Sequence, residues 1–266
     1  MEILLISLVV IAVVALVLYA VLRKNKKPIA QNPFTVEQKK LLAEYVDFYN
    51  NLEEEKKLLF EKRIQQFLSH IRITGVNTTV EELDRVLVAA SAIIPIFGFA
   101  DWEYMNLNEV LLYPDSFNAT FDQQGDDRHT LGVVGDGPYQ NIMILSKHQL
   151  RQDFLNKTGQ SNTAIHEFVH LVDKTDGAVD GVPETLLSKK YVVPWLQLVH
   201  TKIQQIADTE SDINAYGATS QAEFFAVVSE YFFERPDLLE SNHPELFKLL
   251  VHVFKQQPQK AVEPGQ

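Results

Sequence analysis

Residues 161–172 constrain the fold more than any other part of the chain. They contain the pattern His-Glu-x-x-His, formed by His166, Glu167 and His170. The residues within and around the pattern are otherwise apolar or uncharged, which predicts a buried helix. Residues four apart on a helix lie on one face, one turn above the other, so both imidazoles can point at one spot. The fold must therefore bury a helix that carries two imidazoles and a carboxylate.

Two histidine nitrogens at this spacing suit a zinc ion, with bonds of about 2.0–2.1 Å. Glu167 lies close enough to face a water on that ion and to act as a general base. The alternative is two core histidines bonded to backbone carbonyls, with Glu167 in an ion pair. Because an unpaired buried polar group costs about 1–3 kcal/mol, a buried helix does not keep three such groups without partners. The pattern is therefore more typical of a zinc-dependent peptidase than of an ordinary core helix.

The absence of cysteine restricts the kind of metal site. With no Cys among 266 residues, disulfides and thiolate-bound zinc are excluded, so a metal must bind to histidines and carboxylates. The hydrophobic fraction of 46% is enough for a sizeable core, in one large domain or two small ones. The formal net charge of −11 argues against nucleic acid as a partner.

An uncharged apolar run covers residues 3–22, about the length that spans a bilayer. A secretory signal peptide would carry positive charge before such a run, whereas here only the acidic Glu2 precedes it. We therefore expect residues 1–22 to be a transmembrane anchor in a lipid bilayer and residues 23–33 to be a basic linker. The positive-inside rule then puts the following domain in the cytoplasm. The basic cluster consists of Arg23, Lys24, Lys26 and Lys27.

Residues 34–256 are expected to form one mainly helical α+β domain with a small mixed sheet before the His-Glu-x-x-His helix, and residues 257–266 a disordered tail. Short alternating runs predict the strands, at 73–77, 108–114, 131–134 and 141–146. Apolar periodicity and N-caps predict the helices. The first is opened by a capping box of Thr35 and Gln38, and the second covers 52–71, with Leu58, Leu59 and Ile64 inward. A capping box of Thr79 and Glu82 precedes the helix at 83–96, and Ser220 opens the helix at 224–233. The other predicted helices are 194–209 and 244–255.

A catalytic zinc site needs a third protein ligand and keeps one position for water. Asp176 lies where a short metzincin pattern would place its last ligand, but that pattern needs a glycine turn where this chain has Asp173. Glu223 and Glu230 lie seven apart on a later predicted helix and so on nearly the same face. Glu223 also forms a capping box with Ser220, a role that would use the same carboxylate.

Glu223 and Glu230 can hardly touch one ion, because they lie two turns, about 10–11 Å, apart along the helix. Glu230 is therefore expected not to bind the ion itself but to accept a hydrogen bond from a residue that does. His129 and His148 are expected to be surface histidines beside a polar loop and a strand.

The chain carries the His-Glu-x-x-His segment with Asp173, then residues 212–216 and 222–233 and, upstream, Phe67-Leu68, Trp102, residues 110–114 and Gly137-Pro138. With these motifs in this order, the chain resembles the Mlc titration factor A family of bacterial zinc peptidases over roughly residues 34–255. The motifs are specific as a set, although His-Glu-x-x-His alone is common elsewhere.

The resemblance implies a zincin-like active-site fold similar to that of anthrax lethal factor. It implies one zinc ion on His166, His170 and Glu223, a gluzincin-like ligand set, with Glu167 as the base. Tyr216 lies seven residues before Glu223, as does a catalytic tyrosine in the lethal-factor-like arrangement, where the hydroxyl would donate to the oxyanion. The alternative for Tyr216 is a core tyrosine with its hydroxyl hydrogen-bonded.

We therefore expect a peptidase anchored by one span in the bacterial inner membrane, acting on a peptide or protein substrate. The substrate could add as a strand beside residues 131–134 or 141–146. A regulatory protein that sequesters a transcription factor, with zinc mainly structural, is the alternative. Glu167 favours catalysis, because a purely structural site has no use for a base beside the water.

Overall fold

The computed structural model describes residues 34–258 except 101, 126, 136, 184–185, 188 and 209–210. The chain divides into two units, Met1–Pro33 and Phe34–Gln266, and all of the described residues belong to the second. The predicted anchor, the basic linker and most of the predicted tail lie outside the described residues. Of the helices that the structure does describe, none is long and apolar enough to cross a bilayer.

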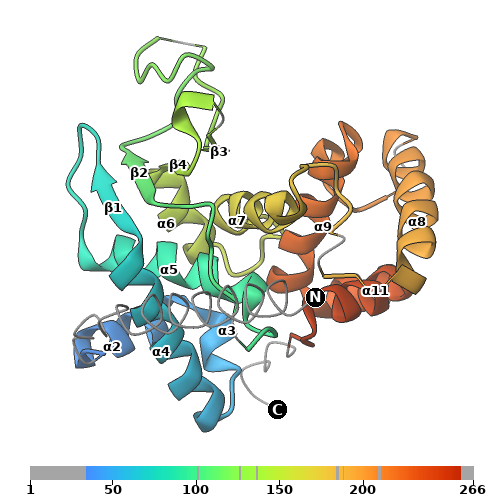
Figure 1. The fold of residues 1–266 in the computed structure, drawn as a ribbon, viewed down its shortest axis with the longest axis horizontal. Coiled ribbons are helices and arrows are strands. Elements are labelled where there is room, and N and C mark those ends of the chain that lie inside the picture. Colours follow the sequence, from blue (N-terminus) through green and yellow to red (C-terminus); the bar gives the residue numbers. More distant parts are fainter. Residues whose placement is uncertain are drawn as a thin grey trace, which may run out of the picture. The chain divides into compact units, whose positions relative to one another are not determined.

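A four-stranded mixed sheet, in the order β1-β2-β4-β3, lies beside the helices (Figure 1). The strands are β1 (Arg72–Gly75), β2 (Glu109–Tyr113), β3 (Gly132–Val134) and β4 (Ile142–Ser146). β1, β2 and β4 run parallel, and β3 pairs antiparallel with β4. Because β4 is paired on both sides, the prediction that residues 141–146 could accept an added strand is wrong. β3 pairs with β4 alone among the described strands and forms an edge.

Helix α7 (Thr163–Asp173) carries the His-Glu-x-x-His pattern through the centre of the domain. It lies between the sheet and α9 (Gln221–Glu234), and it also packs on α5 (Glu82–Ile96) (Figure 1). α5 is apolar enough to be enclosed, and every residue from position 86 to 96 is buried. This packing fixes α7 on several sides, so its polar residues sit on a rigid element.

The remaining helices surround this centre and confirm the predicted mainly helical α+β class. The Thr35–Gln38 capping box is present at the start of the first described helix. Leu58 and Leu59 are 62% and 44% exposed, so the prediction that they point inward is wrong, whereas Ile64 is buried. These helices are α2 (Val36–Tyr45), α3 (Asp47–Asn50), α4 (Glu54–His70), α6 (Lys147–Leu155), α8 (Lys189–Ala207), α10 (Pro236–Asn242) and α11 (Pro244–Phe254), with short 3-10 turns η1 (Gly137–Tyr139), η2 (Lys174–Asp176) and η3 (Ala215–Ala218).

The predicted capping box of Thr79 and Glu82 is also wrong, because α5 uses Glu81 as its N-cap and Asp84 three residues later. The backbone N–H of Glu81 donates to Asp84 Oδ2 at 2.8 Å. Asp84 is fully buried, and Arg151 of α6 donates to its other oxygen at 2.7 Å. A long-range ion pair therefore sets the start of this helix.

Candidate metal centre

The start of α7 is fixed by side-chain caps. Asn162 is the N-cap, and its side-chain oxygen accepts a hydrogen bond from the backbone N–H of Ile165 at 3.1 Å. The backbone N–H of Asn162 in turn donates to Glu230 of α9 at 2.6 Å. Two helices are thus joined at the turn that carries the first histidine. The sequence analysis did not identify Asn162, although its position before an apolar helix is a typical N-cap signal.

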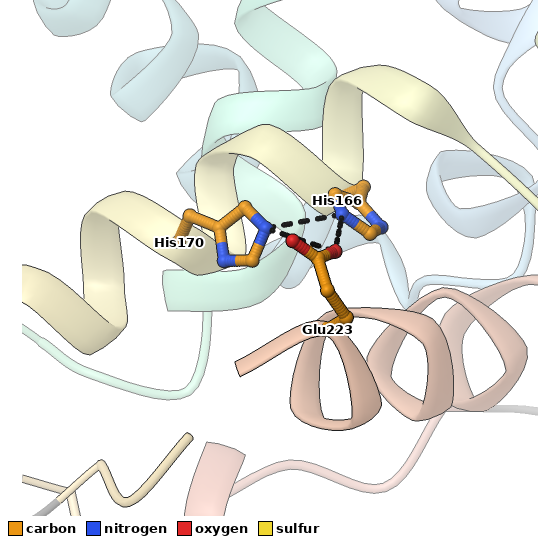
Figure 2. Close-up of side chains that lie close together, drawn as sticks. All are labelled: His166, His170 and Glu223. Carbon is orange, nitrogen blue, oxygen red and sulfur yellow. Dashed lines mark hydrogen bonds and ion pairs between the residues drawn. The ribbon is translucent and has the colours of Figure 1, made fainter. Parts of the chain in front are cut away.

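His166, His170 and Glu223 converge on one point (Figure 2). His166 Nε2 lies 2.9 Å from Glu223 Oε2 and 3.1 Å from His170 Nε2, and His170 Nε2 lies 3.4 Å from the same carboxylate oxygen. The two histidines come from successive turns of α7, and Glu223 reaches them from the first turn of α9. The part of the chain described here has no other group of three or more metal-capable side chains.

His166 is oriented by Glu230, as the sequence analysis predicted for that carboxylate. His166 Nδ1 lies 2.7 Å from Glu230 Oε1, and both residues are buried. Because a carboxylate only accepts, His166 donates from Nδ1 to Glu230 and from Nε2 to Glu223, and a metal ion bound at Nε2 would take the place of the second proton. Burial lowers the pKa of His166, but hydrogen bonds to Glu223 and Glu230 outweigh it and raise the pKa to about 10. The site therefore attracts positive charge, whether a proton or a metal ion.

Glu223 takes only part of the predicted capping role. Its backbone N–H donates to the Ser220 hydroxyl at 3.1 Å, while its carboxylate turns to the histidines. Burial raises the pKa of Glu223, but the hydrogen bonds from His166 and His170 outweigh burial and lower it to about 2. The cap and the ligand role therefore use different atoms of one residue and do not compete.

Glu167 lies in α7 next to the edge strand and is buried. Burial raises its pKa, although the positive charges on His166 and His170 act in the opposite direction. A methyl group at Gly132 of β3 would come within 2.8 Å of Glu167 Cγ and 2.9 Å of its Oε1. Gly132, which the sequence analysis did not single out, therefore gives this carboxylate its space.

Tyr216 lies beside the site, at the surface and not in the core. It sits in η3, its ring centre is 6.0 Å from that of His166, and it is 53% exposed. The core reading of Tyr216 is therefore wrong. Burial, followed by the negative charges on Glu223 and Glu167, raises the pKa of its hydroxyl, so Tyr216 is a proton or hydrogen-bond donor across the neutral range.

The other candidate ligands lie elsewhere. Asp176 is exposed in η2, where its Oδ1 accepts from the backbone N–H of Ala178, and it is not part of the group around His166. His129 and His148 are exposed, as predicted. The carboxylate that joins the two histidines is thus Glu223, the one that the family resemblance implied.

A mainly helical α+β domain in which one helix supplies two histidines and a second helix a carboxylate has the donor set that a metallopeptidase uses to hold a metal ion. The chain belongs to the glucose-regulated metallo-peptidase M90 family, whose model matches residues 20–255. The domain and its His-Glu-x-x-His helix therefore fall inside the matched segment.

Several relatives match the chain over most of its length. An uncharacterized protein of Synechocystis sp. is 29% identical over 248 residues, which cover 88% of this chain and 89% of the relative. The Mlc titration factor A of Cronobacter sakazakii is 30% identical over 220 residues, covering 77% and 80%. That of Serratia proteamaculans is 28% identical over 221 residues, covering 77% and 81%. The resemblance to the Mlc titration factor A family is thereby confirmed.

Proposed function

We propose that this chain is a zinc-dependent peptidase in which His166, His170 and Glu223 hold the ion. The observation that carries this proposal is the mutual spacing of the three donor atoms, at 2.9, 3.1 and 3.4 Å. Tetrahedral zinc with bonds of about 2.0–2.2 Å places its ligand atoms roughly 3.3–3.6 Å apart. Two imidazoles and one carboxylate are also a zinc donor set that leaves a fourth position for water.

Glu167 is the general base of the proposed reaction. A zinc ion in this donor set supplies Lewis acidity, which makes water nucleophilic near neutral pH. Glu167 accepts the proton of that water and later gives it to the leaving amine. Its buried position raises its pKa, so it can take up a proton and return it.

Tyr216 supports the oxyanion in this proposal, because its ring faces the His166 side of the site and its hydroxyl stays protonated. The substrate chain pairs with the edge strand β3, whose Gly132 lies against Glu167. An extended peptide added at that edge would bring its carbonyl carbons past the base.

The decisive experiment is Glu167→Gln in the full chain. Gln keeps the size of the side chain but is not a base, so zinc content should stay the same and peptide hydrolysis should fall by at least about 100-fold. Hydrolysis is measured on a peptide library together with zinc by elemental analysis. A variant that cleaves as fast as the parent would show that Glu167 is not the base.

The relatives named Mlc titration factor A favour a second function, binding of a transcriptional regulator. In that case the metal centre would chiefly hold α7 and α9 together. Glu167→Gln separates the two, since a binding function survives loss of the base and a peptidase does not. We also propose that residues 1–22 anchor the chain in the inner membrane with the domain on the cytoplasmic side, on the basis of the apolar run and the basic cluster that follows it.

A further inference from the structure

The two histidines of the metal centre differ in what lies behind them. His166 Nδ1 is held by Glu230, whereas His170 Nδ1 is buried and has no hydrogen-bond partner among the described residues. A histidine that binds a metal through Nε2 almost always donates its Nδ1–H to a carboxylate, a carbonyl or a water. A partner for His170 is therefore the missing part of this site.

Asp173 offers an acceptor of the required kind. It is the last residue of α7, three positions after His170, and it is fully buried. Its Oδ1 is also buried without a partner in the described part of the chain. Burial, followed by the charges on Asp180 and Asp176, raises the pKa of Asp173 to about 6, while the hydrogen bond from Gly181 and, less strongly, a charge on His170 act in the opposite direction. A buried donor without a partner and a buried acceptor without a partner thus belong to neighbouring side chains.

The second oxygen of Asp173 is already used. Oδ2 accepts a hydrogen bond from the backbone N–H of Gly181 at 2.8 Å. Gly181 has φ +76°, and a methyl group there would lie 2.2 Å from the carbonyl oxygen of Gln221. Trp195 Nε1 donates to the Gly181 carbonyl at 2.7 Å. Gly181 therefore packs closely against Gln221 in the first turn of α9. Gln221 lies two residues before Glu223.

We propose that Asp173 is a positioning residue for two of the three metal donors. Its Oδ1 accepts the Nδ1–H of His170, directly or through one water, and its Oδ2 holds Gly181 against α9 so that Glu223 meets the histidines. This inference rests on the proposed metal site and adds to it the group that orients His170. It also explains why a carboxylate is buried at the end of a helix, where negative charge is otherwise unfavourable.

Asn106 is the rival acceptor. Its Nδ2 donates to the carbonyl of Leu171 at 3.0 Å, so it lies against the same turn of α7, and its Oδ1 is also buried without a partner. An amide is the weaker choice, because only a carboxylate increases the basicity of the ligand by sharing its charge with the imidazole. Asn106 therefore has to be tested beside Asp173.

The test is the zinc dissociation constant of the full chain after removal of metal, measured by chelator competition. Asn has one acceptor oxygen, whereas the His170 Nδ1–H and the backbone N–H of Gly181 need two. In Asp173→Asn the zinc dissociation constant should therefore rise about 10–100-fold. Asp153→Asn is the matched control, since Asp153 is also a buried carboxylate, with a pKa of about 6, that accepts an N–H from α7. Asp153→Asn and Asn106→Ala should leave zinc affinity unchanged, whatever they do to the melting temperature of the metal-free protein.

An unchanged zinc affinity in Asp173→Asn overturns the proposal, as does an equal loss in Asp173→Asn and Asp153→Asn, or a loss confined to Asn106→Ala. If Asp173→Asn does not fold, a crystal structure of the zinc-loaded parent decides. Asp173 Oδ1 must then lie within hydrogen-bond distance of His170 Nδ1 or of one water that contacts both. If the parent protein binds no zinc, the proposed function is refuted. If the parent binds zinc and the Asp173→Asn variant binds it equally tightly, only the present inference is refuted.

Discussion

Glu223 shows how one residue can serve two purposes at the scale of single atoms. Its backbone N–H completes the cap of α9 with Ser220, and its carboxylate faces His166. The sequence alone predicts that the two roles compete, because a capping box would occupy the carboxylate. The choice between Glu223 and Asp176 could not be made from spacing, since it depends on how α9 packs against α7.

Replacing each carboxylate singly tests the third ligand. Glu223→Ala should lower zinc affinity far more than Asp176→Ala, because only Glu223 lies within reach of both histidines. Zinc binding to the metal-free variants is measured by chelator competition. Asp176→Ala is a sound control, since the residue is exposed and its loss leaves the core intact. A larger loss with Asp176→Ala would mean that the site is metzincin-like.

Tyr216 should contribute to turnover and not to stability. Tyr216→Phe keeps the ring and removes the hydroxyl, and losing one oxyanion donor typically costs about 2.7–4 kcal/mol of transition-state stabilisation. We expect kcat to fall about 100–1000-fold while zinc content and melting temperature stay the same, because the residue is half-exposed. Parallel kinetics and thermal melting check this. If melting temperature and activity fell together, the tyrosine would be structural.

At the scale of elements, three carboxylates from two helices surround the start of α7. Asp153 of α6 accepts from the backbone N–H of Thr163 at 2.8 Å, and Glu230 and Glu234 of α9 accept from the backbone and side chain of Asn162. Negative charge near a helix N-terminus is favourable, but three carboxylates together are difficult to ionise. Burial, followed by the charges on Asp153 and Glu230, raises the pKa of Glu234 to about 8.

This raised pKa predicts a pH dependence of folding. The unfolded chain releases the Glu234 proton near pH 4.5, whereas the folded chain holds it until about pH 8. Between these values the unfolded state binds fewer protons, so stability should fall as pH rises. Glu234→Gln keeps an acceptor for Asn162 and cannot ionise, so it should melt at a higher temperature than the parent at pH 8 and lose that advantage at pH 4.5. Thermal melts of both proteins at the two pH values check this, and an equal slope would contradict it.

The elements that the sequence predicted well are those whose signals are local. α7 and α9 have long apolar patterns, α9 also has the N-cap Ser220, and the strands have alternating patterns. The sequence did not predict α6, because Ser146 is both the last residue of β4 and the N-cap of α6. No loop therefore separates the strand from the helix. α8 begins at Lys189, five residues before the predicted start at Pro194, so this proline lies inside the helix.

At the scale of the whole molecule, the sequence predicts a membrane-anchored enzyme with its domain in the cytoplasm. Protease added outside intact cells should leave the domain whole, because the cluster of Arg23, Lys24, Lys26 and Lys27 holds the C-terminal side inside. Immunoblotting of the domain checks this, with permeabilised cells as the control in which digestion must occur. Digestion in intact cells would place the domain outside.

The position of Glu223 on α9 has a further consequence for the chain as a polymer. Glu223 and His166 are 57 positions apart, and α8 lies in the segment between them. An ion shared by these residues acts as a reversible cross-link that closes this long segment into a loop. Closing a loop removes conformational entropy from the unfolded chain, and the gain grows slowly with loop length. A metal ion held by these residues would therefore also stabilise the fold.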